Sequence, residues 1–160
     1  MRRSFALIGV FVTLLLAGQA AAAGLGPGKT AAVKVAACNQ SADGAQRFVT
    51  FKAQMSSESR QLRMQMRFYI YESTGLSWSD VTPPEVAIWD ESAPGSRTYV
   101  YRQRIDNLKP GARYRSAVKF RWLDAAGNVV AMANRRSAVC KMSALISPRA
   151  ALSNSDPLTF

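Results

Sequence analysis

The chain has 160 residues, 48% of them hydrophobic, with 21 Lys and Arg, 10 Asp and Glu and no His, which gives a formal net charge of +11. Without His it cannot form a Ser-His or Cys-His catalytic pair, and its two Cys residues alone cannot close a zinc shell. We therefore expect no enzymatic activity, cofactor or metal site. The positive surplus favours encounter with polyanions such as nucleic acid, cell-wall polymers or acidic glycans.

The first 23 residues have the pattern of a secretory signal peptide. Arg2 and Arg3 precede an apolar run over 5–17, and small residues follow in "AGQAAAAG". The run is shorter than the roughly 20 residues that span a bilayer. We expect cleavage after Ala23 and export to the periplasm, the cell surface or the medium, with a retained membrane anchor as the alternative. Residues 24–32 are expected to form a flexible leader, and no later stretch predicts a membrane span.

Six later segments alternate hydrophobic and polar residues with the period of two that is typical of β-strands. In chain order they cover 32–38, 47–55, 60–71, 97–105, 113–123 and 128–139. The clearest is the third, which places on one side Leu62, Met64, Met66, Phe68 and Ile70. Turn sequences at intervals of roughly ten residues separate the segments, which favours an all-β sandwich over 33–141. A small β-barrel is the alternative.

Two cysteines, Cys38 and Cys140, flank most of this region. In an exported chain an isolated pair predicts one disulfide, and two free thiols are the alternative. The bond would close a loop of about 100 residues, for which the chain-entropy model gives about 4–5 kcal/mol. Beyond it, residues 142–160 are expected to form a poorly ordered tail.

The connection over 76–95 is acidic and aromatic, unlike its surroundings. It contains Trp78, Asp80, Glu85, Trp89, Asp90 and Glu91. Exposed tryptophans beside carboxylates can contact a sugar or a protein, and paired carboxylates can hydrolyse a glycosidic bond. The third interpretation is that both tryptophans pack under the connection while the carboxylates cap turns or balance basic residues.

The stretch "IDNLKPGARY" contains a corner between two strands. Its key residues are Ile105, Leu108, Pro110, Gly111 and Tyr114. Their spacing resembles the E–F tyrosine corner of fibronectin type III domains, within the immunoglobulin-like group. The resemblance implies a seven-stranded sandwich in which the tyrosine hydroxyl bonds to the turn backbone, because a chain that crosses between sheets leaves backbone groups without ladder partners.

Within this resemblance, Pro110 would fix the entry to the turn and Gly111 would supply its unusual backbone angles. The chain departs from the group at two positions. The tryptophan of the second strand is missing, with Phe51 the nearest large residue, and Ser116 stands where an inter-sheet cysteine would be expected. The predicted disulfide would instead join the first and last strands.

In the same arrangement, strands 60–71, 113–123 and 128–139 share a sheet whose outer face is basic. It would collect Arg63, Arg67, Tyr69, Tyr71, Arg113, Arg115, Lys119 and Arg121, with Arg135 or Arg136 added. Basic residues interleaved with tyrosines can hold anionic groups and stack against rings. The alternative is an ordinary solvated sheet face. Because like charges on neighbouring strands repel, Glu58 or Glu72 is expected to balance some of them.

The sequence therefore predicts a secreted, non-catalytic binding module that contacts an anionic polymer or another cell-envelope component. A structural or adhesion protein is the alternative, which would contact a protein partner through a strand edge or through the Trp78–Trp89 connection. A glycan-active enzyme that uses Asp90 and Glu91 is the third hypothesis.

Overall fold

The computed structural model describes residues 25–41 and 45–144. The expected signal peptide and the tail beyond residue 144 lie outside the described residues. The strands are β1 (Lys29–Gln40), β2 (Arg47–Ser57), β3 (Arg63–Ser73), β4 (Ser79–Asp80), β5 (Asp90–Glu91), β6 (Thr98–Ile105), β7 (Arg113–Leu123), β8 (Val129–Arg136) and β9 (Cys140–Lys141). No helix in the described part of the chain is long and apolar enough to cross a membrane.

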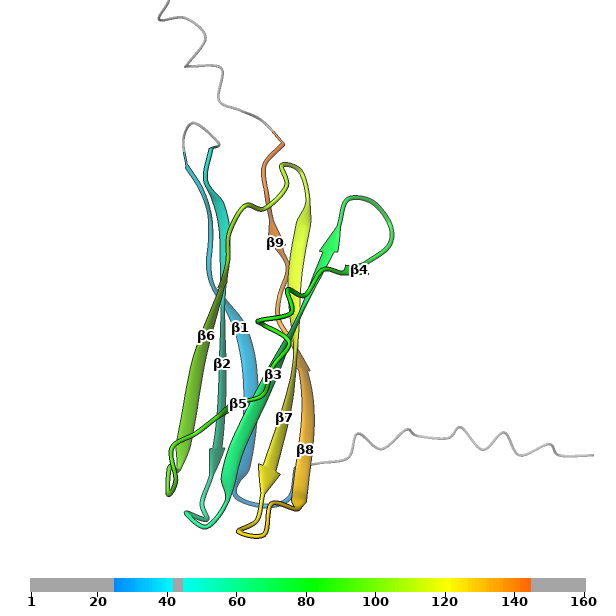
Figure 1. Ribbon diagram of the computed structural model, residues 1–160. Helices are drawn as coiled ribbons and strands as arrows, with labels where there is room; N and C mark the ends of the chain where they lie inside the picture. The colour runs from blue at the N-terminus through cyan, green and yellow to red at the C-terminus, as the bar shows by residue number, and fades with distance from the viewer. Residues whose placement is uncertain (1–24, 42–44, 145–160) are drawn as a thin grey trace, which may run out of the picture.

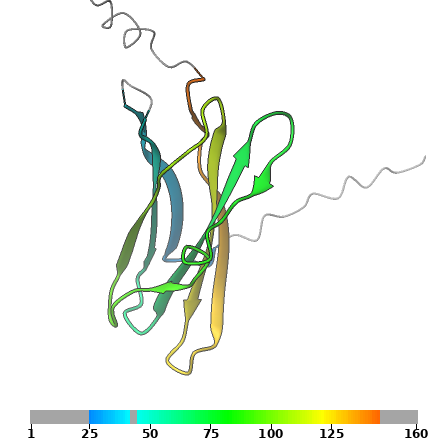
Figure 2. The same ribbon diagram turned by 45° about the horizontal axis from the view of Figure 1, so that its top comes forward.

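The strands form two antiparallel sheets that face each other as two layers (Figure 1; Figure 2). The first sheet has the strand order β1-β2-β6. The second has the order β4-β3-β7-β8, with β5 also paired to β3 and β9 also paired to β7. The strands predicted at 60–71, 113–123 and 128–139 thus share one sheet, as expected.

The alternating pattern decides which side chains enter the core between the layers. Alternate residues over 49–55 of β2 and over 64–70 of β3 are fully buried, which gives the inward set Val49, Phe51, Ala53, Met55, Met64, Met66, Phe68 and Ile70. From β7, Trp122 is also fully buried, and its indole Nε1 donates a hydrogen bond to the Ser56 carbonyl at 3.0 Å. The largest core side chain therefore also ties the second sheet to the backbone of the first.

The corner between β6 and β7 is closed by Tyr114, as predicted. The Lys109 backbone N–H donates to the Tyr114 hydroxyl at 2.9 Å, and the hydroxyl donates to Glu72 Oε2 at 2.6 Å. Gly111 has a φ of 72°, in the left-handed region that glycine adopts without strain. The bond to Glu72 adds a connection to β3 that the corner sequence does not contain.

The predicted disulfide is confirmed. Cys38 of β1 is bonded to Cys140 of β9, with the two Cα atoms 5.7 Å apart and a separation of 102 positions in the sequence. Because β1 lies in the first sheet and β9 pairs with β7 in the second, the bond joins the two layers as well as the first and last strands.

The leader was expected to extend to residue 32, and this is wrong for its last four residues. β1 begins at Lys29, and residues 29–32 pair with residues 54–57 at the end of β2. The reason is that β2 continues two residues beyond its expected end and offers ladder partners there.

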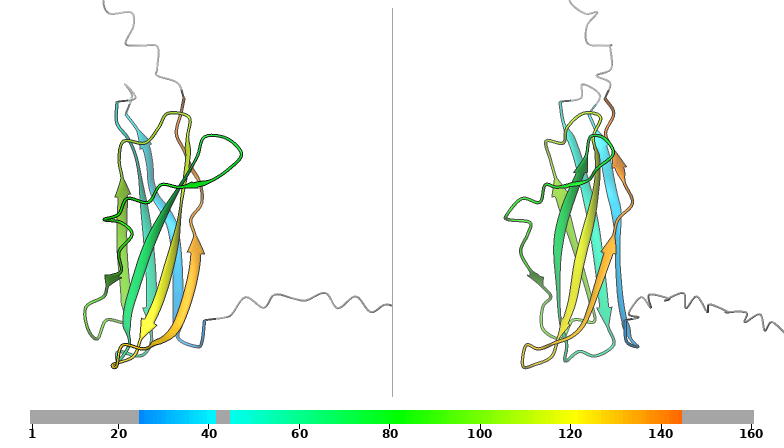
Figure 3. Two further views of the ribbon diagram at one scale, coloured as in Figure 1. Left: turned by 45° about the vertical axis from the view of Figure 1, so that its right-hand side comes forward. Right: turned by 90° about the vertical axis from the view of Figure 1, so that its right-hand side faces the viewer.

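The described residues form nine strands rather than the seven that the resemblance implies: six match the predicted segments, and β4, β5 and β9 are two-residue strands. The segment 128–139 becomes β8, followed after a break by β9, and at the break the Ser116 backbone N–H donates to Ser137 Oγ at 2.9 Å. The connection after β3 carries β4 and β5 before it passes from the second layer to the first (Figure 3). Pro83 and Pro84 lie between them and have no backbone N–H for a ladder, which limits pairing there.

Candidate anion-binding face

The outer surface of the second sheet brings together all eight residues predicted for anion binding. Those from β3 and those from β7 alternate with inward residues, and the register places Arg67 opposite Lys119 and Tyr71 opposite Arg115. From β8, Arg136 joins this surface beside Ala117. We call this surface the basic face: Arg63, Arg67, Tyr69, Tyr71, Arg113, Arg115, Lys119, Arg121 and Arg136.

Arg135, the other candidate from β8, does not belong to the basic face. It pairs in register with Val118, which is a core residue. Its guanidinium instead reaches across to the first sheet, where Nε donates to the Ala31 carbonyl at 3.1 Å. Arg135 therefore links the edges of the two layers, and Arg136 contributes the charge.

At one end of the basic face, Trp78 covers two arginines. The Trp78 ring lies 4.0 Å from the guanidinium carbon of Arg115 and 5.6 Å from that of Arg113. Arg113 also donates to Ser73 Oγ at 2.9 Å and to the Gly75 carbonyl. Such contacts between a cation and an aromatic face are attractive, so the connection holds these arginines rather than leaving them extended in solvent.

At the other end, Trp89 covers Arg121, with 3.9 Å between the guanidinium carbon and the ring centroid. A polar relay completes this end. Arg121 donates to Gln65, Gln65 donates to Glu91, and Glu91 pairs with Arg63 at 3.2 Å. Sequence reasoning did not identify Gln65, since a lone glutamine on a strand carries no signal of its partners.

The centre of the basic face is different, because its cations have no acceptors. The Tyr69 ring lies between Arg67 and Lys119, at 5.2 Å and 5.0 Å from their cationic groups. Within the described residues, no hydrogen bond or ion pair is formed by the side chains of four cations, and Nε of both Arg67 and Arg115 is buried without a partner. These four cations are Arg67, Lys119 and Arg136 at the centre and Arg115 beneath Trp78.

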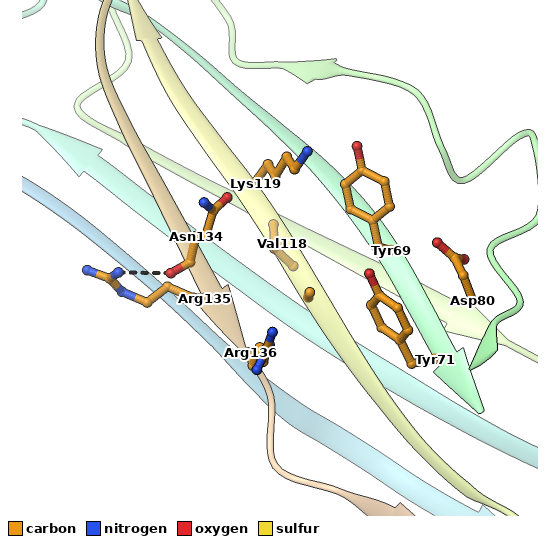
Figure 4. A pocket seen from close by; sticks show the side chains of 9 residues that line it. Tyr69, Tyr71, Asp80, Val118, Lys119, Asn134, Arg135 and Arg136 are labelled. Carbon is orange, nitrogen blue, oxygen red and sulfur yellow. Dashed lines mark hydrogen bonds between the residues drawn. The ribbon is translucent and has the colours of Figure 1, made fainter. Parts of the chain in front are cut away.

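A hollow of about 480 Å³ lies among these groups (Figure 4). Ala117 forms its floor, because this small residue lies in register between Tyr69 on β3 and Arg136 on β8. Figure 4 shows the Tyr69 and Tyr71 rings side by side, with Lys119 beside them and Arg136 across the hollow. Asn134 and Asp80 also line it. The arrangement offers two rings, two positive charges, the Asn134 amide and the Asp80 carboxylate to one ligand unit.

The carboxylates expected to balance the basic face lie elsewhere. Glu72 pairs with Lys109 at 2.7 Å, and this hydrogen bond, with that of Tyr114, holds the pKa of Glu72 below its ordinary value. Glu58 forms no ion pair with a described residue. The balance that exists comes from Glu91, which makes the prediction of Glu58 or Glu72 wrong.

The other carboxylates of the connection serve different purposes. Asp80 Oδ1 accepts from the Thr82 backbone N–H at 2.9 Å and so caps a turn, as one interpretation of the sequence expected. Asp90 pairs with Met66 in register while Glu91 pairs with Gln65, so the two side chains point to opposite sides of β5. Burial raises the pKa of Asp90. No cluster of three metal-ligating side chains occurs within the described residues.

No protein-family model matches the chain, and no curated protein matches it in sequence. Among solved structures, the Northeast Structural Genomics Consortium target SoR45 has a TM-score of 0.43 and 12% identity, over 73% of this chain and 87% of that chain. The putative ApaA protein from Bordetella pertussis has a TM-score of 0.40 and 12% identity, over 71% and 91%. A beta-glucuronidase from Bacteroides uniformis has a TM-score of 0.36 and 14% identity, over 69% of this chain and 13% of that chain. At these TM-scores the similarities carry no inference about function.

Proposed function

We propose that this protein is an exported, non-catalytic binding domain of the fibronectin type III-like sandwich group, and that it holds an anionic polymer on its basic face. Two facing antiparallel sheets and the hydrogen-bonded corner at Tyr114 support the assignment to this group. The disulfide between Cys38 and Cys140 is consistent with an extracytoplasmic location.

The observation that carries the proposal is the set of four cations without acceptors, Arg67, Arg115, Lys119 and Arg136. Like charges on paired strands destabilise a sheet, and Arg67 lies directly opposite Lys119. At the two ends of the basic face, Glu91 pairs with Arg63, and the rings of Trp78 and Trp89 cover Arg113 and Arg121. Asp80 also lines the hollow, but it accepts from Thr82, and no ion pair joins the four cations to a carboxylate among the described residues. An external anion would therefore relieve a repulsion that the fold leaves in place.

In this proposal the polymer lies across β3, β7 and β8. Its charged groups contact Lys119 and Arg136, which flank the hollow, while Arg67 and Arg115 add attraction from beside the tyrosines. Tyr69 and Tyr71 present ring surfaces on which a sugar or a base can stack. Trp78 and Trp89 hold the arginines at the two ends and leave the centre open.

The test is retention of the purified protein on immobilised polygalacturonate and polyphosphate at low and high salt. Lys119→Ser with Arg136→Ser removes two exposed charges from the hollow. Arg60→Ser with Arg97→Ser removes two exposed charges outside the basic face and serves as the matched control.

We expect retention of the wild type to fall steeply with salt, since bound cations release counterions from the polymer. The Lys119 and Arg136 variant should bind about tenfold more weakly than the control variant at low salt and should show a salt slope lower by about 2. Equal elution of the two variants would contradict the proposal. Retention that does not respond to salt would favour a protein-contact function instead.

A further inference from the structure

The opposite side of the molecule carries a second group of cations, arranged in a single row. Lys34 of β1 is directly opposite Lys52 of β2, and Lys52 is directly opposite Arg102 of β6. The first sheet is therefore crossed by three positive charges at one register position. Neighbouring strands lie about 4.8 Å apart, so the row spans about 10 Å.

The row faces away from the core. Val33 and Tyr101, which directly precede Lys34 and Arg102, pack against the core. Ala53, which directly follows Lys52, is fully buried within the core. Because successive side chains of a strand point to opposite sides, Lys34, Lys52 and Arg102 lie on the outer surface of the first sheet. The two layers in Figure 2 separate this surface from the basic face.

The three side chains have no partner of their own. None of them forms a hydrogen bond or an ion pair with another described residue. Two positions along β6 the situation is different, since Arg104 pairs with Asp106 at 2.8 Å and lies 3.6 Å from the ring of Phe48. The contrast marks the row as the part of this sheet where repulsion between strands is left uncompensated.

A shallow hollow of about 270 Å³ lies beside the row, lined by Ala32 and Gln54 together with the two lysines. No aromatic ring lines it. The row can therefore attract regularly spaced negative charges but offers no surface on which a sugar or a base could stack. Its chemistry fits the charged backbone of an extended polyanion.

We propose that Lys34, Lys52 and Arg102 form a second anion-binding site, so that one domain bridges two anionic chains or two segments of one chain. The row itself is independent of the proposed function, whereas the bridging rests on it, because the other chain would occupy the basic face. Two weak sites on opposite surfaces gain strength through multivalency on a long polymer.

The experiment mixes the purified protein with long polygalacturonate and follows network formation by light scattering. Retention on immobilised short polygalacturonate oligomers is measured in parallel. Lys34→Ser with Arg102→Ser removes the two exposed ends of the row, and Arg60→Ser with Arg97→Ser again removes the same charge elsewhere. Thermal unfolding of both variants checks that each is folded.

We expect the row variant to lose light scattering about tenfold relative to the control variant, while its retention on short oligomers falls only about twofold. Its melting temperature should be no lower than that of the wild type, since two repelling charges are removed. If the wild type is retained but scattering is equal in the two variants, the bridging site alone is overturned. The same holds if the wild type is retained but gives no scattering. If the wild type is not retained on the immobilised oligomers at all, the proposed function and the bridging are both overturned.

Discussion

Tyr114 connects three parts of the molecule through one hydroxyl. It accepts from the Lys109 backbone in the turn, donates to Glu72 on β3, and lies on β7. Glu72 also accepts from Lys109 Nζ at 2.7 Å, which closes a small ring of hydrogen bonds. Burial, followed by the bond to Glu72, raises the pKa of Tyr114 to about 12, so the phenol remains a donor over the neutral range.

Tyr114→Phe should lower the free energy of unfolding at pH 7 by about 1–3 kcal/mol, because the Lys109 N–H and the Glu72 carboxylate both lose a buried partner. The pKa of Glu72 is lower in the folded state than its value of 4.5 in the unfolded chain. The ionised carboxylate therefore stabilises the fold above pH 4.5, and this stabilisation is lost as the pH falls through the pKa of the folded state. The deficit of the variant should therefore shrink on acidification, as measured by urea unfolding between pH 7 and pH 3.

Tyr69→Phe is the matched control, since no hydrogen bond of the Tyr69 hydroxyl is found among the described residues. It should unfold within about 0.5 kcal/mol of the wild type. Equal losses in the two variants would mean that the corner hydroxyl contributes no more than a surface hydroxyl does.

At this scale, the sequence predicted what is local. The bond from Tyr114 to the turn backbone joins residues five positions apart, and the resemblance of this stretch to a tyrosine corner implied it. The partner Glu72 is 42 positions away, and no local pattern could identify it. The same holds for Gln65, whose two partners come from β5 and β7.

Among the elements, β4 and β5 are paired segments of only two residues, yet the residue directly before each one is a tryptophan whose ring lies on the basic face. In both, a tryptophan and a carboxylate stand two positions apart, as Trp78 with Asp80 and as Trp89 with Glu91. Residues two apart on an extended chain share a side. The edge of the second sheet thus supplies two similar pairs, one toward each end of the face.

Trp89→Ala should lower the free energy of unfolding by about 1–2 kcal/mol, through lost burial and the lost contact with Arg121. Retention on polygalacturonate should not weaken, because the uncovered Arg121 remains available. Leu76→Ala is the control, since Leu76 is fully exposed and should affect neither property.

A tenfold loss of retention in the Trp89 variant, with stability unchanged, would contradict this assignment. Trp89 would then be a ligand contact, as the sugar-binding interpretation of the connection expects. Both quantities can be read from the same preparation, by chemical unfolding and by elution.

The repeated spacing of tryptophan and carboxylate was visible in the sequence, but the strands around it were not. Two-residue strands carry too little alternation for a period to be recognised. Their place beside β3 depends on how the connection crosses between the layers, which the prolines restrict but do not specify. One of the three sequence interpretations placed the tryptophans under the connection, whereas they lie on the arginines.

For the whole molecule, the disulfide is the bond that joins the two layers covalently. Cys140 is buried, and its neighbours in β9 make only a two-residue ladder with β7. The docking of the C-terminal end against the first sheet therefore relies on this bond.

Replacing both cysteines by serine should lower the free energy of unfolding by about 4–5 kcal/mol, which the chain-entropy model gives for a loop of this length. Urea unfolding of the variant should match that of the wild type with its disulfide reduced. A loss below about 1 kcal/mol would show that the unfolded state is hardly restricted by the bond.

The sequence predicted the layers from an alternation that is repeated along the chain, and the disulfide from an isolated pair of cysteines. It did not predict the row on the first sheet, although Lys34, Lys52 and Arg102 were each visible as polar positions of their strands. Lys34 and Lys52 are lone cations among neutral neighbours, and Arg102 is followed by Arg104 on the same strand. Only the pairing register, which is set by contacts between distant segments, places the three side by side.

The first and last described residues lie at opposite ends of the long axis of the molecule (Figure 1; Figure 3). A mechanical pull on these ends would enter along β1, cross from Cys38 to Cys140 and leave through β9. The 101 residues enclosed by the bond lie outside this load path. Under tension the protein would act as a short, nearly inextensible link. β1 would bear the force, while the basic face and the row of Lys34, Lys52 and Arg102 would stay intact.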